Sequence, residues 1–190
     1  MGNNPLPQTQ LASYDRGFGD FTMKADLNSM KEINYINDHR QVILFSDLYE
    51  TNSNELVAHA PRYLLRKAVE DLKALGYTAQ FQCDINFTVL NDKYKKLAEN
   101  FSVIQPITEH SNQYHALYKQ NFEEFLSKLK SSLKFSGIIV DKIAGDKAPG
   151  QYKVSLGLSN PLEFCDELTI FKLVITIIYD LILVHQEVSR

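Results

Sequence analysis

Cysteine is scarce in this sequence of 190 residues, tryptophan is absent, and the N-terminus lacks the pattern of a secretory signal. The only cysteines are Cys83 and Cys165. Small secreted domains typically carry many cysteines joined as disulfides, so two thiols in a chain without a charged-then-apolar leader predict reduced side chains. We therefore expect a cytoplasmic protein without a disulfide framework.

A surplus of positive charge is also missing. Lys and Arg number 20 against 23 Asp and Glu, which gives a net charge of −3. Proteins that bind nucleic acid or anionic membranes usually present a strongly basic surface. The most apolar segment, residues 168–184, is interrupted by Lys172 and Asp180, whereas a membrane-spanning helix needs about 20 mainly apolar residues. We expect no nucleic-acid partner and no membrane partner.

Hydrophobic patterning predicts an α+β fold, in which helices cover an antiparallel-rich sheet. Runs of β-branched and aromatic residues indicate strands at 42–49, at 77–90, from residue 137 onward and at 151–156. Residues 14–40 contain many Gly, Asn and Asp residues and are expected to form a loop with a short helical turn. Residues 1–13 are expected to be a disordered lead-in.

Helices are expected where capping residues precede apolar residues spaced three or four apart. The first is predicted from Pro61 to a cap at Gly76, because proline suits the first turn of a helix and glycine suits its end. The second is predicted from Asn121, with a buried stripe that ends at Leu133, and the third from Asn160 to about His185. The third is predicted to be buried.

Several short motifs follow one another in a recognisable order. They are Gly17-Phe18-Gly19-Asp20-Phe21 with Ala25-Asp26-Leu27, Ser46-Asp47-Leu48-Tyr49 at the end of a strand, Ala60-Pro61-Arg62, Gly76-Tyr77 followed by Asp84-Ile85-Asn86-Phe87, Gly137-Ile138-Ile139-Val140-Asp141, Asp146 with Pro149-Gly150-Gln151-Tyr152-Lys153-Val154, and Asp166 with Phe171-Lys172. The ordered set resembles the first half of the glutamine synthetase catalytic domain over roughly residues 14–180. Residues 14–190 are therefore expected to form a partial catalytic domain of this family.

The resemblance implies a ligase that joins glutamate and ammonia at the expense of ATP. Mg²⁺ or Mn²⁺ ions would neutralise charge in its transition state. Such hard cations are held by carboxylate oxygens, and residues i and i+2 of a strand face the same side. By resemblance, the metal positions are Asp84, Asn86, Asp146 and Lys153, and the substrate-binding positions are Gly150 and Gln151.

Lys153 departs most from the family pattern, because a glutamate is expected at its position. Asn86 also replaces an anion with a neutral side chain, and Asp84 and Asp146 are each one methylene shorter than glutamate. An ammonium group repels a divalent cation. Lys153 therefore turns away, excludes the ion, or pairs with Asp84 or Asp146 in the place of the ion, and we favour the pairing. The residues alone also allow these positions, with Gly150 and Gln151, to be ordinary solvated strand and turn residues.

These substitutions lead to hypotheses of different classes. In the first, ligase activity is weak or lost, because the metal site is degenerate and only the first half of the domain is matched. In the second, the chain is a non-catalytic structural or interaction protein, as lengsin-like relatives are. In the third, it is a fragment of a longer ligase. We expect self-association or a partner protein, with glutamate and ATP as ligands only if the chain is active.

Overall fold

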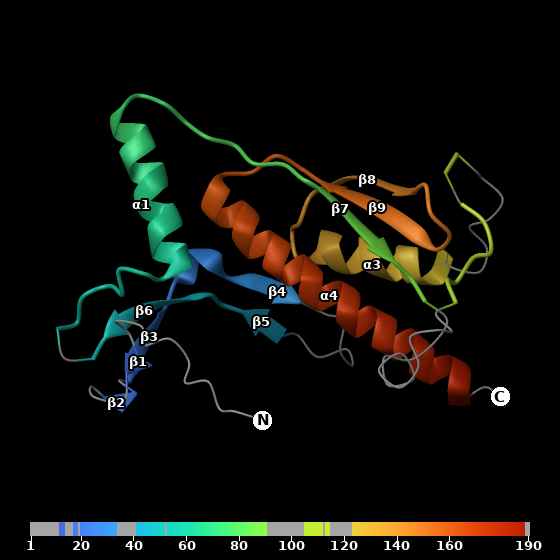
Figure 1. Cartoon of the computed structure of the whole chain (residues 1–190), viewed down its shortest axis with the longest axis horizontal. Helices are drawn as coiled ribbons and strands as arrows, with labels where there is room; N and C mark the ends of the chain where they lie inside the picture. Colours follow the sequence, from blue (N-terminus) through green and yellow to red (C-terminus); the bar gives the residue numbers. More distant parts are fainter. Residues whose placement is uncertain are drawn as a thin grey trace, which may run out of the picture.

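The computed structural model describes residues 12–13, 17–18, 20–33, 41–51, 53–90, 105–111, 113–114 and 123–188, with side chains described from residue 20 to residue 178. Small antiparallel sheets are combined with helices in these ranges (Figure 1). The fold is therefore α+β, as the sequence predicts.

The largest sheet of the described chain has three antiparallel strands in the order β7-β9-β8. They are β7 (Asp84–Thr88), β9 (Gln151–Leu156) and β8 (Val140–Gly145). The helices α3 (Glu123–Phe135) and α4 (Pro161–Val188) lie along this sheet, and α4 extends from beside α1 (Pro61–Ala74) to the C-terminal end of the chain (Figure 1). One face of the sheet is thereby covered, whereas the other, which we call the open face, carries exposed side chains such as Asp84, Asn86 and Thr88.

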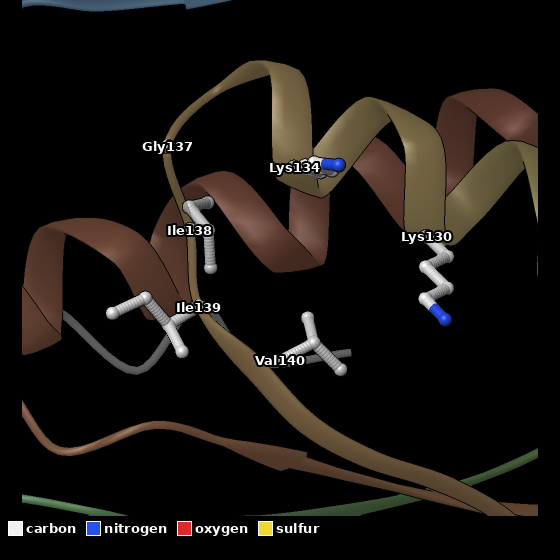
Figure 2. A pocket seen from close by; sticks show the side chains of 6 residues that line it. All are labelled: Lys130, Lys134, Gly137, Ile138, Ile139 and Val140. Carbon is white, nitrogen blue, oxygen red and sulfur yellow. The ribbon is translucent and has the colours of Figure 1, made fainter.

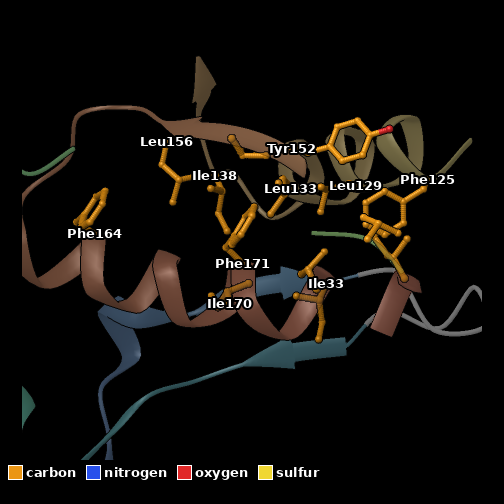
Figure 3. Close-up of a cluster of buried hydrophobic side chains, with 14 residues drawn as sticks. Ile33, Phe125, Leu129, Leu133, Ile138, Tyr152, Leu156, Phe164, Ile170 and Phe171 are labelled. Atoms are coloured by element: carbon orange, nitrogen blue, oxygen red, sulfur yellow. The ribbon is translucent and has the colours of Figure 1, made fainter. Parts of the chain in front are cut away.

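The hydrophobic core lies between the covered face of the sheet and the two helices (Figure 3). Alternate residues of β9 are buried, since successive strand residues point to opposite faces. On α3, the buried side chains recur every four residues, at Phe125, Leu129 and Leu133. Phe171 of α4 completes the centre of the cluster. Full burial of each of these side chains contributes about 1.5–3 kcal/mol.

Short antiparallel pairs make up the N-terminal part of the described chain. β3 (Phe21–Ala25) pairs with β6 (Ser46–Glu50), and β4 (Lys31–Ile33) pairs with β5 (Gln41–Ile43). A 3-10 turn, η1 (Leu27–Ser29), connects β3 to β4. β1 (Ala12–Ser13) pairs with β2 (Gly17–Phe18). Isolated two-stranded ribbons are marginal in water, so this part depends on its contacts with α1 and α4.

The helix ends confirm the predicted capping residues. Gly76 has φ +85°, its N–H donates to the carbonyl of Lys73, and the N–H of Tyr77 donates to the carbonyl of Leu72. These two bonds form a Schellman cap, which favours glycine because of its positive φ. At the start of α4, the Asn160 side chain accepts a hydrogen bond from the Glu163 N–H at 3.1 Å.

Several predicted strands are shorter or divided in the structure. Residues 42–49 are divided between β5 and β6, which pair with different strands. Only Asp84–Thr88 of the predicted strand 77–90 is a strand, flanked by single-residue bridges at Phe81 and Leu90. Gly137 caps α3 with φ +72° instead of beginning a strand, so β8 begins at Val140.

One further expectation is wrong. The region 14–40 is not only loop and helical turn, because β3 and β4 lie within it. The apolar and polar residues of β3 alternate, but every one of them is exposed, so the alternation does not mark a buried face. α1 forms over the predicted range, but it has no buried residue and Leu64 is 50% exposed.

Some expectations fall on residues that the structure does not describe. The lead-in at 1–13 lies outside the described residues except for Ala12–Ser13, and the predicted start of the second helix at Asn121 also lies outside them. In the part of the chain that is described, no helix combines the length and apolar character needed to cross a membrane.

Candidate functional site

The open face of the main sheet carries the residues that the sequence predicts as a site. In the register of β7 and β9, Asp84 lies opposite Ser155 and Asn86 lies opposite Lys153. Residues two apart on a strand share a face, so these four side chains belong to one polar surface. The intervening residues, such as Val154, point into the core. The structure therefore brings Asp84, Asn86 and Lys153 together.

An ion pair occupies this face. The Lys153 Nζ lies 2.5 Å from Asp84 Oδ2, and the Ser155 hydroxyl donates to Asp84 Oδ1 at 2.5 Å. Both carboxylate oxygens of Asp84 are thus engaged within the chain. The hydrogen bond from Lys153, followed by that from Ser155, lowers the pKa of Asp84. The hydrogen bond to Asp84 is the main cause that raises the pKa of Lys153, so both groups stay charged at neutral pH.

Asp146 and Asn86 complete the predicted metal positions. Asp146 follows β8, and its backbone N–H donates to the Gln151 carbonyl at 2.9 Å. The negative charge of Asp146 contributes to the raised pKa of Lys153, after the larger effects of Asp84 and of burial. Asn86 stands across the strand pair from Lys153 and offers only a neutral amide oxygen. The ammonium group of Lys153 is therefore the cation that pairs with Asp84, and Lys142 of β8, opposite Ser155, adds a second positive charge that also lowers the pKa of Asp84.

The donor set does not suit a divalent cation. Mg²⁺ and Mn²⁺ prefer several oxygen ligands, most of them anionic carboxylates. Here the carboxylate of Asp84 is already paired with an ammonium group, and Asn86 is neutral. Among the described residues, no three His, Cys, Asp or Glu side chains gather in a way that could hold a metal ion. The residues present therefore do not fit the metal that the family resemblance implies.

The predicted substrate-binding pair, Gly150 and Gln151, forms a tight turn before β9. Gly150 has φ +65°, and its N–H donates to Thr108 Oγ1 at 2.7 Å. The Gln151 side-chain oxygen accepts a hydrogen bond from the Ala148 N–H at 3.0 Å. An added Cβ at Gly150 would lie 2.7 Å from the Val89 carbonyl oxygen. Glycine is therefore required for close packing here, and these polar atoms make contacts within the chain.

A second cluster of charges was not predicted as a unit from the sequence. We call it the ionic cluster, and it consists of Asp26, Asp47, Arg62, Arg66 and Asp166. Arg62 on α1 lies 2.8 Å from Asp26 Oδ2, 3.0 Å from Asp47 Oδ1 and 2.9 Å from Asp166 Oδ2. The cluster thus joins η1, β6, α1 and α4, whose residues are far apart in the sequence.

The ionic cluster is largely shielded from solvent. Its aspartate side chains are 9–15% exposed and that of Arg62 is 16% exposed. The hydrogen bonds that Arg62 donates, first to Asp166 and then to Asp26 and Asp47, raise its pKa. The hydrogen bond from Arg62 is the main cause that lowers the pKa of Asp26. A signal was present in the sequence, because Asp26, Asp47, Arg62 and Asp166 all lie in the quoted motifs.

Comparison with known proteins agrees with this architecture. The model of the glutamine synthetase catalytic domain matches residues 58–180, so the chain belongs to the glutamine synthetase family. It is 28% identical over 170 residues to gamma-glutamylethanolamide synthetase GlnA4 of Streptomyces coelicolor, an alignment that covers 89% of this chain and 36% of that protein. It is 23% identical over 159 residues to a glutamate–isopropylamine ligase of a Pseudomonas species, covering 83% of this chain and 34% of that protein.

A solved structure shares the fold. The crystal structure of a novel glutamine synthase homolog superposes with a TM-score of 0.66 at 18% sequence identity, over 83% of this chain and 34% of that one. The chain spans about a third of the length of the relatives it matches. The main sheet with its helices therefore corresponds to part of a larger ligase architecture.

Proposed function

We propose that this chain is a non-catalytic member of the glutamine synthetase family. Both curated relatives are named for joining glutamate to an amine, and the family chemistry on this chain would be ATP-dependent ligation of that kind with Mg²⁺ or Mn²⁺. The observation that carries the proposal is the contact of 2.5 Å between Lys153 Nζ and Asp84 Oδ2. An ammonium group stands where ligation chemistry would require a divalent cation.

An ammonium group cannot replace a divalent ion when a phosphoryl group is transferred and a carboxylate is activated. A divalent ion neutralises the charge that develops on transferring phosphate oxygens and holds both reactants in place. An ammonium is a single charge without coordination geometry, so it does not perform both tasks. A metal ion that displaced Lys153 from Asp84 would meet one free carboxylate and a neutral Asn86. We therefore expect glutamate ligation by this chain to be weak or lost.

Two measurements on the purified full chain test the proposal. In the first, the chain is incubated with glutamate, ATP, Mg²⁺ or Mn²⁺, and ammonia, ethanolamine or isopropylamine, while ADP and γ-glutamyl amides are followed by mass spectrometry. We expect no product above the background without protein. Turnover of any of the three amines would contradict the proposal.

The second measurement isolates the role of Lys153. Binding of Mn²⁺ is followed by electron paramagnetic resonance in the wild type and in Lys153→Glu, with Lys67→Glu on the exposed surface of α1 as a control of equal charge change. We expect Lys153→Glu to bind Mn²⁺ at least about tenfold more tightly than the other two proteins, because a carboxylate then replaces the ammonium beside Asp84. Equal Mn²⁺ affinity in all three proteins would show that Lys153 does not control the site.

An interaction role is the second candidate, and exposed apolar side chains favour it. Met23 on β3 is 72% exposed, Leu27 on η1 is 75% exposed, and Leu75 at the end of α1 is 73% exposed. Exposed apolar side chains that form a contiguous patch commonly mark surfaces that bind other proteins. We propose that they mediate self-association or contact with a partner protein. Light scattering of the purified chain tests this, and a monomer at high concentration would count against self-association.

A further inference from the structure

A pocket of about 330 Å³ lies between α3 and the beginning of β8 (Figure 2). It shares no residue with the open face that carries Asp84 and Lys153. Its lining residues come from the last turns of α3 and from the segment that connects this helix to the strand. They are Lys130, Lys134, Gly137, Ile138, Ile139 and Val140.

The floor of the pocket is apolar. Ile138 is buried at 3% exposure and belongs to the core, whereas Ile139 is 63% exposed. Gly137 leaves space, because a Cβ added there would meet no atom within 4 Å. Ligand pockets begin at about 300 Å³ and combine apolar walls with a few polar groups. The size therefore suits one large apolar side chain or a group of similar volume.

The rim of the pocket is positively charged. Lys130 and Lys134 are four residues apart on α3, so their side chains share one face of the helix (Figure 2). Within the described ranges, no carboxylate pairs with either lysine, although Lys128 on the same helix pairs with Glu124 at 2.7 Å. The positive charge of this rim is opposite in sign to the net charge of the whole chain, which is −3. The local charge is complementary to an acidic ligand.

An outer strand runs directly from the pocket. β8 pairs with β9 on one side, and no strand or bridge in the described part of the chain pairs with its other side. An outer strand presents backbone N–H and C=O groups that another extended segment can bond. The register shifts between Val140 and Lys142, and β8 is regular from there to Gly145. A peptide backbone could therefore pair with β8 beside the pocket.

We propose that the pocket and the outer edge of β8 together bind an extended acidic segment of another protein. In strand addition, main-chain hydrogen bonds give affinity and pockets select alternate side chains. Residues two apart on the added strand would face α3, at a spacing of about 7 Å. One of them, an apolar residue, fills the pocket, and the next, Asp or Glu, contacts Lys130 and Lys134. The inference goes beyond ligation chemistry and does not depend on Lys153.

A second copy of this chain fits the site less well than an acidic partner. Pairing β8 with the β8 of another copy would bring the same lysines of both copies to one interface, and like charges repel. A small organic acid would use the lysines and the pocket but not the strand edge. The combination of edge, apolar floor and positive rim favours a peptide.

The experiment uses the full chain and fluorescein-labelled octapeptides, followed by fluorescence anisotropy. In the probe, leucine and glutamate alternate at the odd positions and threonine fills the even positions. A second peptide carries lysine instead of glutamate. A third carries backbone N-methyl groups, which block strand pairing. We expect saturable binding of the probe and at least about tenfold weaker binding of both other peptides.

Variants of the chain identify the surface. Lys130→Glu/Lys134→Glu should bind the probe at least about tenfold more weakly. Lys67→Glu/Lys73→Glu on α1, which lies apart from α3 in Figure 1, changes the net charge equally and should bind like the wild type. Circular dichroism checks that both variants are folded.

Four results would overturn the proposal. They are the absence of saturable probe binding up to about 1 mM, equal affinity of the two double variants, equal affinity for the N-methylated peptide, and self-association in light scattering that Lys130→Glu/Lys134→Glu abolishes. The last result would identify a second copy of the chain as the occupant.

Discussion

Replacing Arg62 with methionine tests whether the ionic cluster holds the N-terminal strands and α1 against α4. Methionine keeps much of the side-chain length but removes the guanidinium. Arg62 makes two hydrogen bonds to Asp166, at 3.2 and 2.9 Å, one to Asp47 at 3.0 Å and one to Asp26 at 2.8 Å. In the variant, Arg66 still contacts Asp26 and Asp47. Asp166, at 9% exposure, loses its guanidinium partner.

The expected cost follows from this loss. Removing one partner of a buried ion pair typically destabilises a protein by about 3–5 kcal/mol, because a charge remains buried without compensation. The 16% exposure of Arg62 lets some water replace the lost contacts, so we expect about 3 kcal/mol. For a chain of this size, that corresponds to a decrease in Tm of about 6–12 °C. Arg62→Lys should fall between methionine and wild type, because an ammonium keeps the charge but lacks the rigid fork of donors that makes two bonds to Asp166.

Thermal unfolding and urea titration, both followed by circular dichroism, measure these differences. Lys67→Met is the matched control on the same helix, because Lys67 is exposed and makes no described ion pair. We expect it to change the free energy of unfolding by less than about 0.5 kcal/mol. If Arg62→Met were as stable as this control, the ionic cluster would not be the attachment between α1 and α4.

The same cluster predicts a dependence on pH. The pKa of Asp26 is lowered in the folded chain, mainly by the hydrogen bond from Arg62. Its contribution to stability is therefore fully present above the unfolded pKa of about 3.9 and is lost as the pH falls through the lower folded pKa. The difference in stability between wild type and Arg62→Met should be largest near pH 7 and should shrink below about pH 4. A constant difference down to pH 2 would contradict this assignment.

Two pairs of substitutions test the packing that supports the site. Gly150→Ala should destabilise by about 2–3 kcal/mol, because positive φ strain adds to the contact with the Val89 carbonyl. Gly137→Ala, at a similar φ but in open space, should cost only about 1 kcal/mol; equal costs in urea titrations would refute the role of close packing. Leu129→Ala in the core should cost about 2–5 kcal/mol, whereas Leu64→Ala on exposed α1 should cost less than about 1 kcal/mol. Similar Tm values for these last two variants would show that the core is not centred on α3.

Local chemistry made the helices predictable. Pro61, Gly76 and Asn160 act through their own backbone and the next few residues, so their effects are visible in sequence. The strands were harder to bound, because pairing partners and not the strand itself decide where pairing ends. The segment 42–49 looks continuous, but β5 and β6 pair with different strands. The apolar and polar residues of β3 do alternate, but the strand is short and fully exposed and lies in a segment rich in Asn and Asp, which favoured a loop.

The candidate site was predictable where strand alternation alone determines geometry. Asp84 and Asn86 had to share a face, and pairing of Lys153 with Asp84 or Asp146 was the favoured hypothesis, of which the structure shows the pair with Asp84. The ionic cluster was not predictable as a unit. It requires η1, β6, α1 and α4 to meet at one point, which depends on tertiary packing. The residue that links them, Arg62, was visible only as part of a motif.

The matched motifs therefore separate into two groups with different physical tasks. The charged residues of the first group, Asp26, Asp47, Arg62 and Asp166, satisfy one another at the junction of α1 and α4 and maintain the fold. In the second group, on the open sheet face, the positive charge of Lys153 pairs with Asp84. Loss of the cluster would destabilise this fold, whereas reversal of charge on an exposed sheet face costs little in folding. A chain in which the first group is complete and the second is altered has the properties expected if its fold is used for binding and its ligation chemistry is not.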